Sequence, residues 1–214
     1  MRPNSSFKSI RPSSKEDKSA GGIEHEKLGL FETLFGILFQ PVPTIKRIVS
    51  AEPFSLAVFI SFLASLVIFT PQIADRAVFF PDLTPVMLLA LLTAIANLLL
   101  LFIGVLFFTL FARFLGGNSN YFGFFAAAGI SQLVFFLYPV VVFISRLAGP
   151  PAYLGIFMRN VLLVWYYLLF LISLRESQKF SSLRAVLTVG GTVAAFSVLV
   201  FLLGAGALAL MFSF

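Results

Sequence analysis

The sequence has no cysteine and only one histidine, His25, and these absences exclude much of protein chemistry. Without cysteine there is no disulfide and no thiolate ligand for a metal ion, and a single histidine cannot form a histidine cluster. The sequence also shows no GxSxG, HExxH, P-loop or paired-carboxylate pattern. We therefore expect no enzymatic activity, no cofactor and no metal site.

Charged residues are scarce as well. They make up 11% of the chain, against roughly a quarter in an ordinary soluble domain, whereas 59% of the residues are hydrophobic and the mean hydropathy is +1.02. Water cannot solvate such a surface, so the composition indicates an integral membrane protein. The net charge is +6, and eight of the fifteen Lys and Arg residues lie before Pro53, with no interleaved aromatic motif. We expect no nucleic-acid partner, and we attribute the charge to membrane topology and anionic lipid headgroups.

Residues 1–27 form the most polar part of the chain. They hold six serines, two prolines and mixed charges, and cannot bury enough apolar surface to offset their ordering entropy. No stretch before residue 54 resembles the hydrophobic region of a signal peptide. We therefore predict a disordered tail that stays in the cytoplasm.

Residues 28–52 are predicted to be an amphipathic interfacial segment. Apolar side chains recur there with the spacing of one helical stripe: Phe31, Leu34, Phe35, Leu38 and Phe39. Pro41 and Pro43 are expected to end this helix, and Thr44 to cap a second short one. Lys46 and Arg47 lie on the polar face of that second helix. The segment could lie in the headgroup plane, with phenylalanines toward lipid and basic residues toward phosphate, or its stripe could pack on the membrane bundle.

Five apolar stretches within residues 53–214 are candidates for membrane-spanning helices, each of which needs about 20 apolar residues. Turn signals separate stretches at about residues 54–69, 86–111, 121–144, 154–174 and 185–214. The first is the shortest, the third contains Pro139, and the fifth has no charged residue. The predicted fold is all-α: a polytopic membrane bundle of about five transmembrane helices behind the tail and the interfacial segment.

The distribution of basic residues predicts the orientation of this bundle. With the amino terminus in the cytoplasm, twelve of the fifteen Lys and Arg residues lie inside, and Arg76, Arg146 and Arg159 lie outside. We expect a multi-pass protein of the cell (inner or plasma) membrane with its carboxyl terminus outside.

The deepest polar side chains of the predicted spans are Thr93, Asn97, Ser131 and Gln132, and no ionisable residue lies at mid-span. They are a candidate intramembrane polar site between the second and third spans. The simpler interpretation is interhelical hydrogen bonding, which contributes only about 0.6 kcal/mol on average in membranes. The aromatic cluster Trp165-Tyr166-Tyr167 leaves two similar alternatives, a cavity wall or packing between helices.

Small residues recur every fourth position on the third span, at Gly123, Ala127 and Ser131. Such spacing lets helix backbones approach closely, either within the chain or between two copies of it. We predict a helix-contact face at these three residues.

Several short segments occur in an order that is known from one family. They are Phe31-Glu32-Thr33-Leu34-Phe35, Pro41-Val42-Pro43-Thr44, Glu52-Pro53, Phe111-Ala112-Arg113-Phe114-Leu115-Gly116-Gly117, Ile130-Ser131-Gln132, Pro139, Trp165 and Leu183-Arg184-Ala185. Together they resemble the Yip1 domain family over about residues 31–201. The resemblance implies five helices and a cytoplasmic amino terminus, in agreement with the charge distribution.

Eukaryotic members of that family are associated with Rab GTPases and vesicle traffic, whereas the prokaryotic members, which this chain resembles more, have no settled activity. The Asp-Leu-Tyr-Gly-Pro motif of eukaryotic members is missing, and Gly129-Ile130 replaces the expected Gly-Tyr pair. No Rab role is carried over. We expect a non-enzymatic scaffold or membrane-organising, trafficking-like partner, with a small transporter or channel as the alternative. Its expected partners are the lipid bilayer and either a second copy or another membrane protein.

Overall fold

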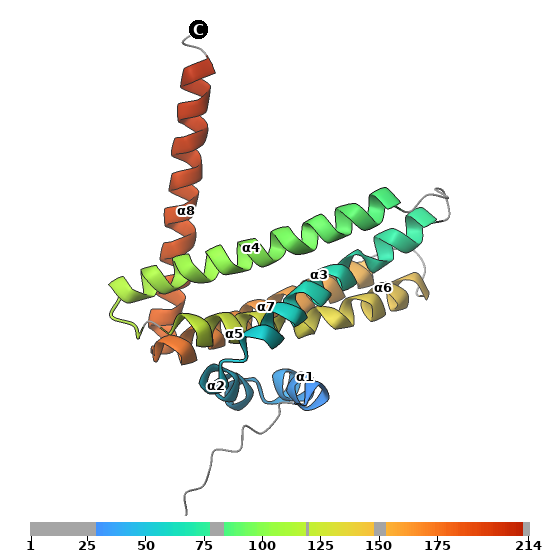
Figure 1. Ribbon diagram of the computed structural model, residues 1–214, viewed down its shortest axis with the longest axis horizontal. Coiled ribbons are helices and arrows are strands. Elements are labelled where there is room, and N and C mark those ends of the chain that lie inside the picture. The colour runs from blue at the N-terminus through green and yellow to red at the C-terminus, as the bar shows by residue number, and fades with distance from the viewer. Residues whose placement is uncertain (1–28, 78–83, 119, 148–152, 212–214) are drawn as a thin grey trace, which may run out of the picture.

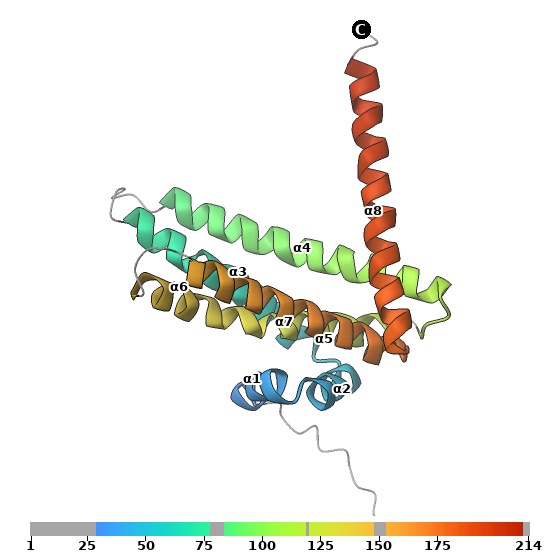
Figure 2. The same ribbon diagram turned by 180° about the vertical axis from the view of Figure 1, so that it is seen from behind.

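The computed structural model describes residues 29–77, 84–118, 120–147 and 153–211, so the predicted disordered tail lies outside the described residues. The described residues are 92% helical and include no strand, which confirms the all-α prediction. Figure 1 shows the chain from the amino-terminal helices to the carboxyl-terminal one, and Figure 2 shows it from behind.

The amino-terminal pair consists of α1 (Leu30–Phe39) and α2 (Pro41–Ala51), separated by Gln40 alone. We expected the second helix to begin at Thr44, but it begins at Pro41. Proline fits the first turn of a helix, because its missing N–H has no partner there in any case. Thr44 instead donates its hydroxyl to the Gln40 carbonyl oxygen at 2.8 Å. Both helices run across the direction of the long bundle helices (Figure 1).

The bundle is built from α3 (Phe54–Ala77), α4 (Thr84–Phe114), a third segment and α7 (Tyr153–Gln178). The third segment consists of α5 (Tyr121–Ser131), the 3-10 helix η1 (Gln132–Leu137) and α6 (Tyr138–Leu147). Pro139 explains this break. Proline has no N–H for the preceding turn and its ring clashes with the carbonyl four residues earlier, so the chain tightens into a 3-10 helix before it.

The centre of the bundle is α5, in which every residue from Gly123 to Ser131 is buried. Helices α2, α3, α4 and α7 all contact it. At Gly129 the backbone of α5 approaches α3 so closely that an added Cβ would lie 3.0 Å from the Ala57 Cβ and 3.1 Å from the Ala57 carbonyl oxygen. Close packing on all sides makes α5 the element that holds the other helices in place.

The last helix, α8 (Ser182–Met211), contacts the ends of α4 and α7 and then projects away from the bundle (Figures 1 and 2). Among the described residues, three helical segments are long and apolar enough to cross a membrane: Thr84–Phe114, Tyr121–Leu147 and Tyr153–Gln178. Phe54–Thr70 and Ser182–Val198 are apolar but shorter. A membrane protein is therefore confirmed, whereas the number of five crossings stays a prediction.

Candidate functional site

Helix α2 is fixed to the bundle by its apolar face. Ile45, Ile48 and Val49 are buried in the hydrophobic core, where α2 contacts α5 and α7. This face is the one that the sequence pattern placed opposite Lys46 and Arg47. Lys46 is exposed and Arg47 is half-buried. The second half of the predicted interfacial segment is thus an integral part of the bundle surface.

Helix α1 buries one face, at Thr33 and Ile37, and exposes the other. Phe31, Phe35 and Phe39 are 81%, 61% and 74% exposed, and the rings of Phe35 and Phe39 stack with their centroids 6.0 Å apart. These three side chains, which we call the phenylalanine stripe, follow one another at intervals of four residues along one face. Leu34 and Leu38 are half-buried, so the five predicted apolar positions divide between two environments.

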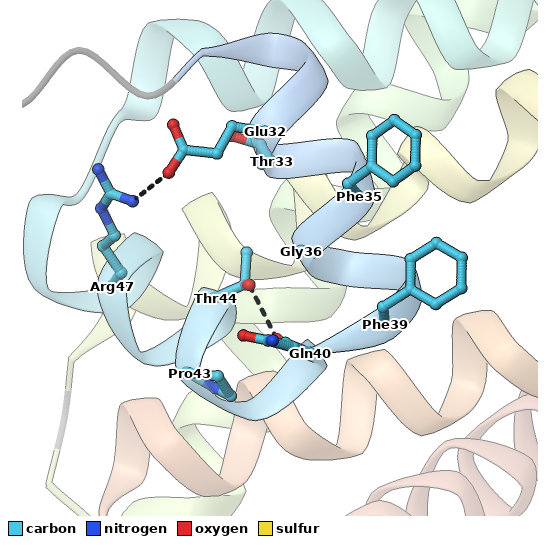
Figure 3. Close-up of a pocket in the computed structure, with 9 residues that line it drawn as sticks. All are labelled: Glu32, Thr33, Phe35, Gly36, Phe39, Gln40, Pro43, Thr44 and Arg47. Atoms are coloured by element: carbon cyan, nitrogen blue, oxygen red, sulfur yellow. Dashed lines mark hydrogen bonds and ion pairs between the residues drawn. The ribbon is translucent and has the colours of Figure 1, made fainter.

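Two contacts hold α1 against α2. Arg47 Nη1 donates to Glu32 Oε1 at 2.9 Å, and the two helices meet at Gly36. A Cβ at Gly36 would lie 2.4 Å from the Thr44 hydroxyl oxygen, so the absence of a side chain permits this approach. The two helices enclose a groove of about 410 Å³, with Phe35 and Phe39 at its rim (Figure 3).

The position of α1 relative to the bundle determines whether the phenylalanine stripe can contact lipid. Helix α1 contacts η1, the middle of the third bundle segment, so it lies alongside the bundle and not beyond its end. The sequence left open whether this segment lies in the headgroup plane or packs on the bundle, and α2 packs on the bundle. The stripe on α1 stays free for lipid, and that lipid contact remains a prediction.

A cluster of polar side chains lies inside the bundle. Asn97 on α4 donates from Nδ2 to the Ser65 hydroxyl oxygen on α3 at 2.7 Å, and to Gln132 Oε1 on η1 at 3.3 Å. Tyr166 on α7 lies at the same cleft as Gln132. Asn97, Gln132 and Tyr166 line a cleft of about 220 Å³ that is otherwise apolar. Side chains from four segments therefore meet at one level of the bundle.

The other two residues of the candidate polar site lie elsewhere. Thr93 is half-buried and donates its hydroxyl to the Leu89 carbonyl oxygen of its own helix at 2.8 Å. Ser131 donates to the Ala127 carbonyl oxygen at 2.7 Å, and its hydroxyl oxygen lies 3.5 Å from that of Ser173 on α7. The structure thus brings Asn97 and Gln132 together and leaves Thr93 and Ser131 apart.

Ser65 does not stand out in the sequence, and Tyr166 stands out there only as one residue of an aromatic cluster. Ser65 donates its own proton to the Ser61 carbonyl oxygen at 2.8 Å, which leaves its oxygen available to Asn97. No sequence signal distinguishes such a serine from one that is satisfied by its own helix. For the aromatic cluster the sequence offered two alternatives, a cavity wall or packing between helices, and Tyr166 lines the cleft.

The residues of the candidate helix-contact face, Gly123, Ala127 and Ser131, are all buried in α5. The space beside Gly123 is occupied by the Asn120 side chain, which caps α5 by accepting a hydrogen bond from the Gly123 N–H at 2.8 Å. Ser131 faces α7 through Ser173. A close approach of α5 to the backbone of α3 occurs at Gly129, which the four-residue spacing does not include.

No group of three His, Asp or Glu side chains that could hold a metal ion occurs within residues 29–77, 84–118, 120–147 and 153–211.

Comparison with known proteins gives one match. A family model described as Yip1 domain matches residues 35–204, which run from the second half of α1 to about three quarters of the way along α8. No curated protein and no solved structure matches the chain.

Proposed function

This chain belongs to the Yip1 domain family, and from that premise we propose that it is a non-enzymatic, multi-pass scaffold that organises the membrane and its partners through helix and lipid contacts. The phenylalanine stripe carries this proposal. Three aromatic side chains stand exposed on a helix that lies beside the bundle, and α2 fixes that helix through its buried face.

Burial of apolar surface gives the stripe its affinity for lipid. Full burial of a phenylalanine side chain is worth about 2 kcal/mol, so three of them supply several kcal/mol even when burial is partial. Helix α1 runs across the bundle direction, which is the orientation of an amphipathic helix in the membrane plane when the bundle helices cross it (Figure 1). Glu32 and Arg47 form an ion pair, so their opposite charges partly offset one another and the cost of placing α1 and α2 near lipid is lower.

The ends of the helices support a cytoplasmic position for the amino-terminal pair. Helix α4 ends, α5 begins, α7 ends and α8 begins at the same end of the bundle, and α3 begins closer to this end than to the other (Figures 1 and 2). The basic residues at this end are Lys46, Arg47, Arg113, Arg175, Lys179 and Arg184. Such an excess of basic side chains is typical of the cytoplasmic face. We therefore place the amino terminus inside and, with five crossings, the carboxyl terminus outside the cell membrane.

The test of the scaffold function replaces Phe31, Phe35 and Phe39 together by serine. Deleting residues 31–49 would be less informative, because it also removes the buried Ile45, Ile48 and Val49. The matched control replaces the same three residues by leucine, which retains the apolar surface. We expect the serine variant to lose the partners that are crosslinked to the wild type in native membranes, and the leucine variant to keep them. Equal recovery from both variants would contradict the proposal.

One observation favours transport of a small solute as a second function. The cleft at Asn97, Gln132 and Tyr166 combines apolar walls with a few polar groups, as binding sites for small molecules do. The test is flux of ions and metabolites into liposomes that contain the wild type or an Asn97→Leu variant. Transport predicts flux above that of empty vesicles and its loss in the variant, whereas flux equal to that of empty vesicles excludes it.

A further inference from the structure

A second, more strongly charged cleft lies where α2 and α7 end. Its volume is about 570 Å³, within the range of ligand sites. Carboxylates and basic side chains both line it, and neither contributes to the polar cluster inside the bundle. The charged lining residues are Lys46, Glu52, Arg175, Glu176 and Lys179.

The charges in this cleft are only partly matched by one another. Arg175 donates from Nε to Glu176 Oε1 at 3.0 Å, and the two form an ion pair. Lys46, Glu52 and Lys179 make no side-chain hydrogen bond or ion pair within the described parts of the chain. Two ammonium groups and one carboxylate therefore face the cleft without a protein partner.

The backbone presents two of these three residues in an unusual way. Glu52 has φ 46° and Lys179 has φ 54°, and they are the non-glycine residues with positive φ among those that the structure describes. Each directly follows the end of a helix, α2 or α7, where glycine is the residue that adopts this conformation without strain. Both helix ends therefore carry a charged side chain into the same cleft.

The unmatched charges define the chemistry of a ligand. Two lysines favour a phosphate group, and one carboxylate beside them favours an ammonium group. A phosphoethanolamine headgroup carries both charges a short distance apart. The cleft also lies at the end of the bundle that the proposed orientation places among cytoplasmic headgroups, so such a ligand is available there as part of a lipid.

We propose that this cleft binds the headgroup of a phosphatidylethanolamine-type lipid, with its phosphate between Lys46 and Lys179 and its ammonium group at Glu52. The proposal rests on the proposed orientation of the chain in the membrane. It adds a specific lipid site to the non-specific lipid contact of the phenylalanine stripe.

The experiment measures lipid retention by native mass spectrometry of the full chain, delipidated in detergent and offered equal amounts of phosphatidylethanolamine and phosphatidylglycerol. In detergent the result does not depend on the phenylalanine stripe or on orientation, so its failure is distinguishable from failure of the scaffold function. We expect the wild type to retain phosphatidylethanolamine in preference to phosphatidylglycerol. The double variant Lys46→Gln/Lys179→Gln is expected to retain both lipids about tenfold less, because it removes two ion pairs to the phosphate that are formed by solvent-exposed lysines.

Two further variants separate charge from backbone. Glu52→Gln removes the carboxylate, and Glu52→Gly also removes it but adopts positive φ without strain. Both are expected to retain phosphatidylglycerol as the wild type does and to lose the preference for phosphatidylethanolamine. The control is Arg113→Gln, an exposed basic residue at the same end of the bundle and outside the cleft, which should bind both lipids normally.

Three results would overturn the proposal. The first is equal retention of lipid by Lys46→Gln/Lys179→Gln and Arg113→Gln, which would show that the two lysines do not bind the phosphate. The second is equal retention of the two lipids by the wild type, which would show that Glu52 does not bind the ammonium group. The third is displacement of the lipid by an equal concentration of soluble phosphoethanolamine, which would make the free compound the ligand instead of the membrane lipid.

Discussion

Asn97 on α4 donates its side-chain amide to the Ser65 hydroxyl oxygen on α3 at 2.7 Å, and the same amide nitrogen lies 3.3 Å from Gln132 Oε1. One side chain thus joins two long helices to the break in the third segment. Asn97 is half-buried, and in lipid neither of its bonds could be replaced by bonds to water.

Replacing Asn97 by leucine is therefore expected to destabilise the bundle by about 1 to 2 kcal/mol, since each interhelical hydrogen bond in a membrane contributes about 0.6 kcal/mol and Gln132 loses a partner. Unfolding in mixed micelles measures the change in free energy. The control is Thr93→Val on the same helix, whose hydroxyl bonds only to its own helix and whose loss should be nearly neutral. Equal destabilisation by both variants would contradict the prediction.

Gly129→Ala is expected to destabilise the protein because the added methyl group would press against the α3 backbone at the Ala57 carbonyl oxygen. Overpacking of this kind costs about 1 to 3 kcal/mol, which outweighs the gain of about 1 kcal/mol in helix propensity. Gly104→Ala is the matched control, because no atom lies within 4 Å of the Cβ position there. Thermal unfolding should place Gly129→Ala below the wild type and Gly104→Ala at or above it. The reverse order would refute the close approach of α5 to α3.

The phenylalanine stripe is expected to contact acyl chains. Trp165 is the only tryptophan of the chain, so Phe35→Trp in a Trp165→Phe background gives a single fluorescent probe on α1. Lipids brominated on their acyl chains should quench this probe strongly after reconstitution. A probe at Ser50, which is exposed on α2, serves as comparison and should be quenched much less. Equal, weak quenching at both positions would show that α1 faces water.

The predicted orientation can be tested with single cysteines, since the chain has none of its own. A cysteine at Lys179 should react with a membrane-impermeant maleimide only after the cells are opened. A tag after Phe214, which lies outside the described residues, should be accessible from outside intact cells. A cytoplasmic tag would require an even number of crossings, and the first or the fifth span would then be the one that does not cross.

Most of the fold follows from local patterns in the sequence. The apolar runs predict the helices, because a span in lipid must satisfy its backbone internally and be apolar over its length. Pro139 marks the break in the third segment, and Asn120 begins α5 as its cap. Three of the predicted spans have the length and composition to cross a membrane, while α3 and α8 are apolar over shorter described stretches.

The candidate sites were predictable only in part. Asn97 and Gln132 stand out in the sequence as amides at depth, and the structure joins them. Ser65 does not stand out, because one hydroxyl on an apolar helix looks the same whether it bonds to its own helix or to another. The charged cleft was equally hidden, since Lys46 and Glu52 lie more than 120 positions before Arg175 and Lys179 along the chain.

The sequence by itself determined that this protein resides in a membrane and consists of helices, because composition and apolar periodicity depend on neighbouring residues alone. It also determined the family, through the order of its short segments. Only the tertiary structure decided how the amphipathic segment divides, with α2 buried on the bundle and the phenylalanine stripe of α1 exposed beside it. Both helices have an apolar stripe, and such a stripe indicates only that one face of the helix is not exposed to water. Whether protein or lipid covers that face depends on which surface of α5 and α7 remains open, and that surface exists only once the bundle has formed.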